Sequence, residues 1–360
     1  MSLFHYYVVE LDLLEVVGAC TNNGNAGFST TLTCSDQSSY STSVKTHKFT
    51  DTGLILTESD IHKCVNKVSE TTPKLKAGNG VASRAKCTVN FKNFVGDPNL
   101  TSPAIVANTS LENNGTFFGK MKQRNILTNR PVRIKYYKVD AGVTTLVRTN
   151  HYICVGFKQS KSNMWSMSCQ DILYKADNKK SQFPRIIKAK LTSDITAGET
   201  SIAVAGDIAD WTDYAKYTAV IGDDLLMITN ATGSSTAVTL TVVRAASITL
   251  GSRTITNTPS DHSSGDEVFR GRKFANADLF DVIEAVFVDA DMLTTDYDGT
   301  AIAAELSSWI PSMSGSVDAI FYEADDSDSV LNDLCQAFML DIYTDTSIGK
   351  ATLKAVSPWN

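Results

Sequence analysis

Three carboxylates in the sequence TTDYDGTAIAAE, which begins at Thr294, have the spacing of a calcium-binding loop. If the glycine takes the sixth position of such a loop, Asp296, Asp298 and Glu305 take the third, fifth and twelfth positions. The first position is then Thr294, which lacks the carboxylate expected there. We therefore favour a polar turn between two helices and keep calcium as the alternative. No other metal and no cofactor is expected.

The sequence contains no set of residues with the spacing of a catalytic motif. Its five histidines are scattered, and none lies in an HExxH motif or beside a GxSxG motif. Asp325, Asp326 and Asp328 form an acidic segment, but its place before a helix start is typical of solvated charge near a helix N-terminus. We therefore expect a protein that is not an enzyme.

The seven cysteines indicate free thiols, because their number is odd and no CxxC motif occurs. Cys87, Cys154 and Cys169 lie on the apolar side of alternating runs, which predicts buried thiols. This cysteine usage suits assembly in a reducing cytoplasm.

A basic and aromatic run, NNGTFFGKMKQRNILTNRPVRIKYY at residues 113–137, suits an assembly contact better than a catalytic pocket. The candidate contact residues are Phe117, Phe118, Lys120, Arg124, Arg130 and Arg133. For the two phenylalanines, a place in a β-barrel core is the alternative. We expect a protein partner rather than nucleic acid, because the pI of the chain is near 5.4 and no nucleic-acid module is recognisable.

Charge reverses sign near the middle of the chain. Residues 1–190 hold 25 Lys and Arg against 13 Asp and Glu, a net of +12, whereas residues 191–360 hold 8 against 26, a net of −18. Either the two regions differ only in surface composition, or the basic region meets an acidic partner, which includes the acidic region of another subunit.

Bulk composition is ordinary for a globular protein of two or three domains: 360 residues, 42% hydrophobic and 20% charged. No apolar run reaches the roughly 18 residues of a transmembrane helix. The N-terminal apolar stretch contains Glu10, Asp12 and Glu15 and lacks a basic start, so it predicts a first strand rather than a signal peptide.

The first half of the chain shows the alternation of β-strands. Apolar and polar residues alternate at 84–91, 132–137, 152–156 and 165–169, and the polar stretch 158–163 predicts a hairpin connection. Residues 21–43 are rich in Asn, Gly, Ser and Thr, which predicts a long loop. Residues 1–190 are therefore expected to form a β domain.

Residues 191–270 differ in composition and predict an inserted small all-β domain. They are rich in Thr, Ala, Gly, Ser and Val, and turn signals at Gly222-Asp223 and Gly233-Ser234 separate short alternating runs. The expected fold class is mainly β, of the α+β type.

Helices are expected only in residues 271–360. One is predicted around 279–287 with Asn276 or Asp278 as N-cap, and another around 330–338 with Ser327 or Asp328 as N-cap. A hairpin at 342–356 follows, with its turn near 347–350.

Three motifs occur in order along the chain. GTFFG, then RN, then RPVRI lie within 115–134; IGDxL, then TLTVxR, then HxxGDxV lie within 221–268; and a helix leads into a hairpin that ends in LKAVSP at 353–358. Together they resemble the baseplate hub, or tail-tip hub, proteins of long-tailed bacteriophages.

The resemblance implies a structural virion protein. It is expected to form a trimeric ring that joins the tail tube and distal tail ring to the central fibre or spike. Residues 1–190 would hold a hub β-barrel domain, 191–270 the inserted domain and 271–360 a second hub region. Relatives often have more N-terminal cysteines than the Cys20 and Cys34 found here.

The same resemblance implies where the protein acts and what it touches. The expected partners are two further copies of the chain, the distal tail protein, the tail tube or tape measure protein, and the fibre or spike. The expected location is the virion tail tip after assembly in the host cytoplasm, with only indirect contact to the host envelope.

Two alternatives stay open. One is a receptor- or carbohydrate-binding tail module that recognises its ligand through 191–270, although the single Trp211 of that region offers few stacking aromatics. The other is a hub with cell-wall hydrolase activity, which would clear peptidoglycan in a zymogram. We expect no clearing.

Overall fold

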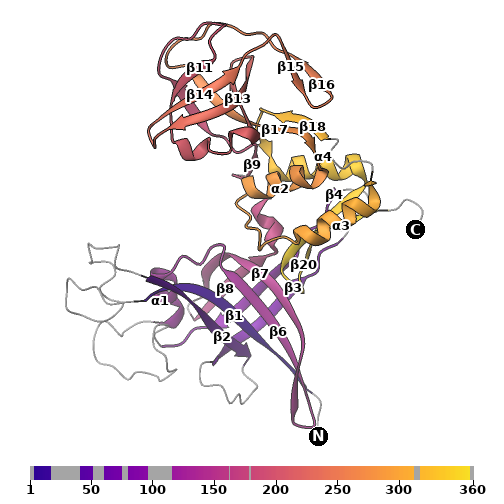
Figure 1. Cartoon of the computed structure of the whole chain (residues 1–360). Helices are drawn as coiled ribbons and strands as arrows, with labels where there is room; N and C mark the ends of the chain where they lie inside the picture. Colours follow the sequence, from indigo (N-terminus) through magenta and orange to yellow (C-terminus); the bar gives the residue numbers. More distant parts are fainter. Residues whose placement is uncertain are drawn as a thin grey trace, which may run out of the picture. The chain divides into compact units, whose positions relative to one another are not determined.

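The computed structural model describes residues 4–17, 41–51, 61–74, 80–95, 116–161, 163–177, 180–311 and 317–356. The chain folds into two compact units (Figure 1). The first comprises residues 1–74, 83–172 and 344–350, and the second comprises 75–82, 173–343 and 351–360. The predicted loop 21–43 lies largely outside the described residues, and its last three residues belong to a strand.

The first unit is a closed β-barrel with strand order β1-β2-β3-β5-β8-β7-β6. All neighbouring strands pair antiparallel except β2 and β3, which are parallel. The strands are β1 Phe4–Val17, β2 Ser41–Asp51, β3 Ile61–Thr71, β5 Lys86–Lys92, β6 Pro131–Asp140, β7 Val143–Lys161 and β8 Met164–Gln170.

Alternation along these strands fills the barrel with apolar side chains. Cys87, Val89 and Phe91 of β5 are buried, while the residues between and beside them are partly or fully exposed. The predicted strands at 84–91, 132–137, 152–156 and 165–169 and the hairpin at 158–163 are confirmed. On β7 the inward set shifts at a bulge between Cys154 and Gly156.

A short helix, α1 Phe117–Arg124, contributes Phe117, Phe118 and Met121 to the core of this barrel. The expectation that helices occur only after residue 270 is therefore wrong. Helix α1 has no acidic residue in its first turn and no side-chain cap at Thr116, so the usual start signals are missing.

The second unit contains a smaller barrel. Its 7-stranded sheet has the order β10-β11-β14-β13-β12-β17-β18, and an additional pairing of β10 with β17 closes all but β18 into a ring. The strands are β10 Lys188–Leu191, β11 Ser201–Ala205, β12 Tyr217–Ile221, β13 Asp224–Gly233, β14 Ala237–Val243, β17 Glu267–Ala277 and β18 Val317–Phe321. Trp211 lies at the centre of its apolar core.

A separate hairpin, β15 Ser247–Leu250 and β16 Arg253–Thr256, covers part of the outer face of this small barrel. Ile248 and Ile255 of the hairpin pack against Val220 and Leu225. Asp318 accepts hydrogen bonds from Ser252 and from the backbone of Asn276, so the hairpin is tied to the ends of β17 and β18.

Three helices follow the small barrel: α2 Leu279–Asp289, α3 Gly299–Trp309 and α4 Ser327–Phe338. A capping box of Asp278 and Asp281 begins α2, and Asp278 is one of the two N-cap residues that the sequence predicted. Helix α4 begins one residue earlier than predicted, with Asp326 at the N-cap position. No described helix is long and apolar enough to cross a membrane.

The predicted C-terminal hairpin is confirmed as β20 Leu340–Asp345 and β21 Lys350–Ala355. β20 pairs in parallel with β4 Gly80–Val81, and β9 Gln182–Phe183 pairs with β19 Asp325–Asp326. Short 3-10 helices complete the described elements at Ile172–Lys175, Ile208–Asp210 and Tyr214–Lys216. The fold is thus mainly β with barrels, as the fold-class prediction states in its coarse form.

Candidate assembly surfaces and polar sites

The aromatic pair of the basic run lies inside the first barrel. Phe117 and Phe118 are 1% and 0% exposed. Their ring centroids lie between 4.6 and 6.1 Å from those of Phe49, Phe91 and Phe94. The expectation that they contact a neighbouring subunit is corrected, because rings that fill a core present no surface to a partner.

The basic residues of the same run do not form one surface either. Lys120 is buried, and Arg130 donates from Nε to the backbone oxygen of Ile126 at 3.0 Å. The side chain of Arg124 lies outside the described residues. The run therefore supplies core and local contacts where we predicted a shared contact face.

Arg133 binds two carboxylates on the neighbouring strand β1. Its Nε donates to Glu10 at 2.8 Å, and its two terminal nitrogens donate to Asp12 at 2.6 and 2.7 Å. Lys135 donates to the other oxygen of Glu10 at 2.7 Å. Charge reversal at Arg133 would thus break contacts within the barrel, and a loss of assembly in that variant would not identify a subunit contact.

These contacts set the pKa values of both acids. Burial would raise the pKa of Glu10 and of Asp12, but the hydrogen bonds and charges of Arg133 and Lys135 outweigh it and hold each pKa below its ordinary value. Asp12 also accepts from Thr46. The cluster is a part-buried ion network that holds β1 against β6.

The carboxylate of Glu70 links strands across the lumen of the first barrel. Glu70 on β3 accepts hydrogen bonds from Tyr136 on β6, and from Asn150 and Tyr152 on β7 at 2.9 and 2.7 Å. Arg148 lies with one nitrogen 3.5 Å from Glu70 and its guanidinium 4.1 Å from the centre of the Tyr136 ring. Burial, and then the bond to Glu70, raise the pKa of both tyrosines. Since its described partners already satisfy both oxygens of Glu70, the group braces the barrel.

Strands β6 and β7 continue past the barrel as a long hairpin (Figure 1). β7 pairs with β8 only from Ile153 onward, so no described strand lies along the other edge of residues 143–150. Val143, Leu146 and Val147 on this segment are 65%, 48% and 58% exposed. A free, partly apolar strand edge is a template for pairing with another chain.

The calcium candidates do not converge. Asp296 accepts from Lys175 Nζ at 2.6 Å and from the backbone of Leu293, Asp298 caps α3 through the Ala301 N–H, and Glu305 accepts from the backbone of Ala355. In the described part of the chain, no cluster of three His, Cys, Asp or Glu side chains could hold a metal ion. Residues 294–298 lie in the connection between α2 and α3, and each candidate carboxylate accepts a hydrogen bond from a protein group.

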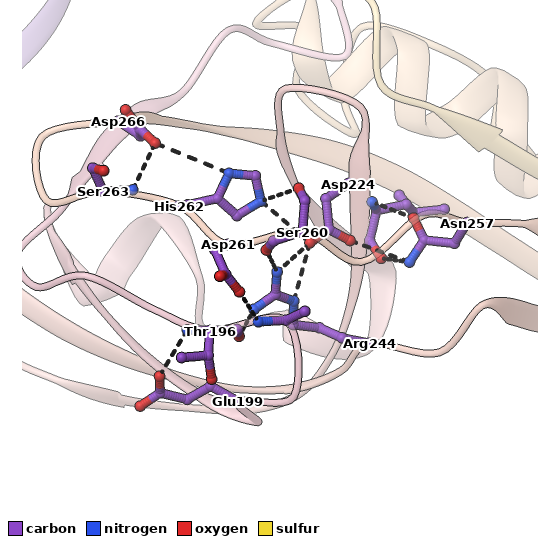
Figure 2. A network of polar contacts seen from close by, with 12 residues as sticks. Thr196, Glu199, Asp224, Arg244, Asn257, Ser260, Asp261, His262, Ser263 and Asp266 are labelled. Atoms are coloured by element: carbon purple, nitrogen blue, oxygen red, sulfur yellow. Dashed lines mark hydrogen bonds and ion pairs between the residues drawn. The ribbon is translucent and has the colours of Figure 1, made fainter.

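A buried polar network in the small barrel surrounds Asp224, which occupies the variable fourth position of the IGDxL motif (Figure 2). Asp224 and Arg244 form an ion pair whose side chains are 0% and 1% exposed. Arg244 also donates to the backbone oxygens of Thr196 and Ser260, and Asn257 donates to Asp224 at 3.2 Å. The network ties the start of β13 and the residue after β14 to the β10–β11 and β16–β17 connections.

His262 completes the network without forming a catalytic relay. Its Nε2 lies 3.3 Å from both Ser260 Oγ and Asp224 Oδ2, so serine and buried carboxylate face the same ring nitrogen. The other nitrogen, Nδ1, lies 4.0 Å from Asp266, which is beyond a hydrogen bond. In a Ser-His-Asp relay the histidine is the base, and the serine nucleophile and the carboxylate lie on opposite ring nitrogens. The arrangement therefore fixes a loop.

A groove of about 630 Å³ opens beside the small barrel, lined among others by Lys188, Asp223, Phe269, Tyr322 and Glu323. Tyr322 is 52% exposed. By contrast Trp211, the aromatic considered for glycan stacking, is wholly buried in the core and cannot meet a ligand.

The described cysteines are all free and buried: Cys64, Cys87, Cys154, Cys169 and Cys335. Cys87, Cys169 and Cys154 lie side by side on β5, β8 and β7. Burial raises the pKa of Cys154 to about 11 and the pKa values of the other two further. They are therefore protonated thiols, as the prediction of buried free thiols states. Cys20 and Cys34 lie outside the described residues.

Comparison with models of known protein families gives no match to this chain, and comparison with curated proteins gives no match either. The case for a function therefore rests on the residues and surfaces described above.

Proposed function

We propose that the chain is a structural protein of a phage tail: the hub of the tail tip or baseplate, assembled as a ring of three copies. The observation that carries the proposal is the free edge of β7 at residues 143–150. Proteins that stay monomeric cover or charge such edges. This edge exposes Val143, Leu146 and Val147, and its one charged residue, Arg148, lies 3.5 Å from Glu70.

A ring of subunits is the simplest way to use such an edge. When the edge of one copy meets a different surface of the next, the contact is heterologous, and it closes into a ring if the rotation allows. The barrels supply rigid bodies for such a ring, since closure pairs their strands and the lumen is braced by Glu70.

The proposal includes the partners and the place implied by the motifs. The ring would join the tail tube or tape measure protein and the distal tail protein to the central fibre or spike, in the virion, after assembly in the host cytoplasm. Its role would be mechanical and not enzymatic.

Immunogold labelling tests the proposal. An antibody against the purified chain is applied to virions whose genome encodes it, and gold is located by electron microscopy. The proposal expects labelling at the distal end of the tail, at least after the tip is opened by mild denaturant. Labelling of heads or side fibres, or a protein absent from virions by immunoblot, would contradict it.

A second candidate function is recognition of a saccharide in the groove beside the small barrel. The specific observation is the exposed Tyr322 ring next to the acceptors Asp223 and Glu323, since an aromatic face with nearby carboxylates suits a sugar. A glycan array probed with the full chain and with Tyr322→Ala would test it. Binding that Tyr322→Ala removes would favour this function.

A further inference from the structure

One outer face of the first barrel carries lysines and no acidic residue at the described outward positions of its strands. On β3, β5, β8 and the paired part of β7, the outward positions are Lys, Ser, Thr, Asn, Gln, Met, Gly or Ile. We call this surface the lysine face; its lysines are Lys67, Lys86, Lys92, Lys158 and Lys161.

The register of the strands makes the lysine face broad and even. Lys67, Asn90, Ser166 and Lys158 are successive partners across four strands, and Lys92, Met164 and Lys161 form the next row. With strands about 4.8 Å apart, the end lysines of the first row are roughly 14 Å apart. The lysines are exposed and make no ion pair with a described residue.

The second unit carries the opposite charge on an exposed segment that ends in the short strand β19. Residues 322–326, which we call the acidic loop, are all exposed and contain Glu323, Asp325 and Asp326. None of these three carboxylates forms an ion pair with a described residue, whereas Glu10, Asp224 and Asp289 elsewhere are all paired.

Some basic residues of the first half of the chain form ion pairs with acidic residues inside the second unit. The basic segment 173–190 belongs to that unit, where Lys175 pairs with Asp296, Arg185 with Asp291 and Lys188 with Glu267. The charged residues of the lysine face and of the acidic loop, by contrast, form no such ion pairs with described residues.

We infer that the lysine face of one copy binds the acidic loop of the next copy in the ring. The inference rests on the proposed function for the ring itself and adds the contact that closes it. The two surfaces differ, so the contact is heterologous, as a ring requires. Exposed charges of opposite sign fix register and speed encounter, and salt weakens them.

Charge reversal with restoration tests this contact. Lys67→Glu/Lys158→Glu and, separately, Glu323→Lys/Asp325→Lys are expected to reduce the oligomer to a monomer in light scattering of the full chain. The quadruple variant, in which both surfaces are reversed, is expected to recover the oligomer. Added salt is expected to dissociate the natural oligomer at least tenfold more readily at 0.5 M than at 0.05 M.

A matched control keeps the result specific. Lys190→Glu/Lys354→Glu makes the same change in net charge on exposed lysines outside the lysine face, which likewise form no ion pair with a described residue, and should keep the oligomer. The inference is overturned if both reversed variants keep the oligomer, or if the quadruple variant fails to recover it. These outcomes concern mass alone, so the immunogold test of the proposed function can succeed or fail independently.

Discussion

Asp224 and Arg244 form an ion pair that solvent does not reach, and the pair holds together three segments of the small barrel. Taking one partner away would leave a buried charge without compensation, which is more costly than the loss of an exposed pair. The value of the pair to the protein is therefore structural, at a point where the described geometry offers no relay.

Asp224→Ala is expected to lower the free energy of unfolding of the second unit by about 3–5 kcal/mol, because Arg244 would stay buried and unpaired. Chemical denaturation followed by tryptophan fluorescence measures this through the buried Trp211. Asp223→Ala is the control. The carboxylate of Asp223 is exposed, so this substitution should change the free energy of unfolding by less than about 0.5 kcal/mol. Equal effects in the two variants would contradict this account.

Arg133→Gln tests the ion network between β1 and β6. Glu10 and Asp12 have folded-state pKa values below their unfolded values of about 4, so their stabilisation is complete above that range and is lost as the pH falls through the lowered values. We expect the variant to be less stable than the natural protein by about 2 kcal/mol at pH 7. The difference should shrink toward pH 3, and urea titrations at both pH values measure it.

A difference that stays constant between pH 7 and pH 3 would show that Arg133 acts through packing and not through charge. Lys138→Gln serves as the control on the same strand, because its partner Asp140 is exposed. Such a pair contributes little at any pH.

Phe118→Ala separates a core role from a contact role. Loss of a fully buried phenylalanine costs about 3–5 kcal/mol of unfolding free energy. The loss should appear in thermal or urea unfolding of the barrel, while Phe4→Ala at a 41% exposed position should have little effect. An unchanged stability with a lower oligomeric mass would restore the contact role that the structure argues against.

Single residues also show where sequence reasoning ends. The contacts of Glu70 join residues 66, 80 and 82 positions apart, and no local pattern marks them. Arg244 and His262 lie in separate motifs of the sequence, and only the fold brings both to Asp224. By contrast, buried thiols were predictable, because Cys87 and Cys169 each lie between polar neighbours and Cys154 lies in an apolar run.

At the scale of elements, the period of two along the strands was a reliable guide. It predicted β5, β6 and β8 and the hairpin between β7 and β8, because one face of each strand fills the barrel. Helix α2 was predictable from its capping box, whereas α1 has adjacent phenylalanines and no cap. Helix α1 is stabilised by packing of its phenylalanines in the barrel core, and no local sequence signal predicts this packing.

Leu146→Lys/Val147→Lys places charge on the free edge of β7. We expect the oligomer to be lost, because lysine on an edge strand opposes pairing with another chain. The unfolding free energy should be unchanged, since both side chains are exposed. Light scattering and urea titration together measure the two quantities. Val44→Lys, at an exposed position of β2 away from this edge, is the control and should leave the mass unchanged.

At the scale of the whole molecule, two units with opposite charge balance suggest a protein that is completed by its neighbours. The sequence showed this asymmetry directly, since charge needs no fold to be counted. It did not show that the six basic residues of segment 173–190 belong to the acidic unit, because that division depends on which strands close the second barrel.

The central claim is that the chain works as a ring of three. The most direct measurement is the molar mass of the full chain by light scattering over a hundredfold range of concentration. We predict a discrete species at three times the 39.0 kDa of one chain. It should dissociate on dilution, and no species larger than the trimer should form at any concentration. A monomer at every concentration, or a mass that grows without limit, would contradict the claim.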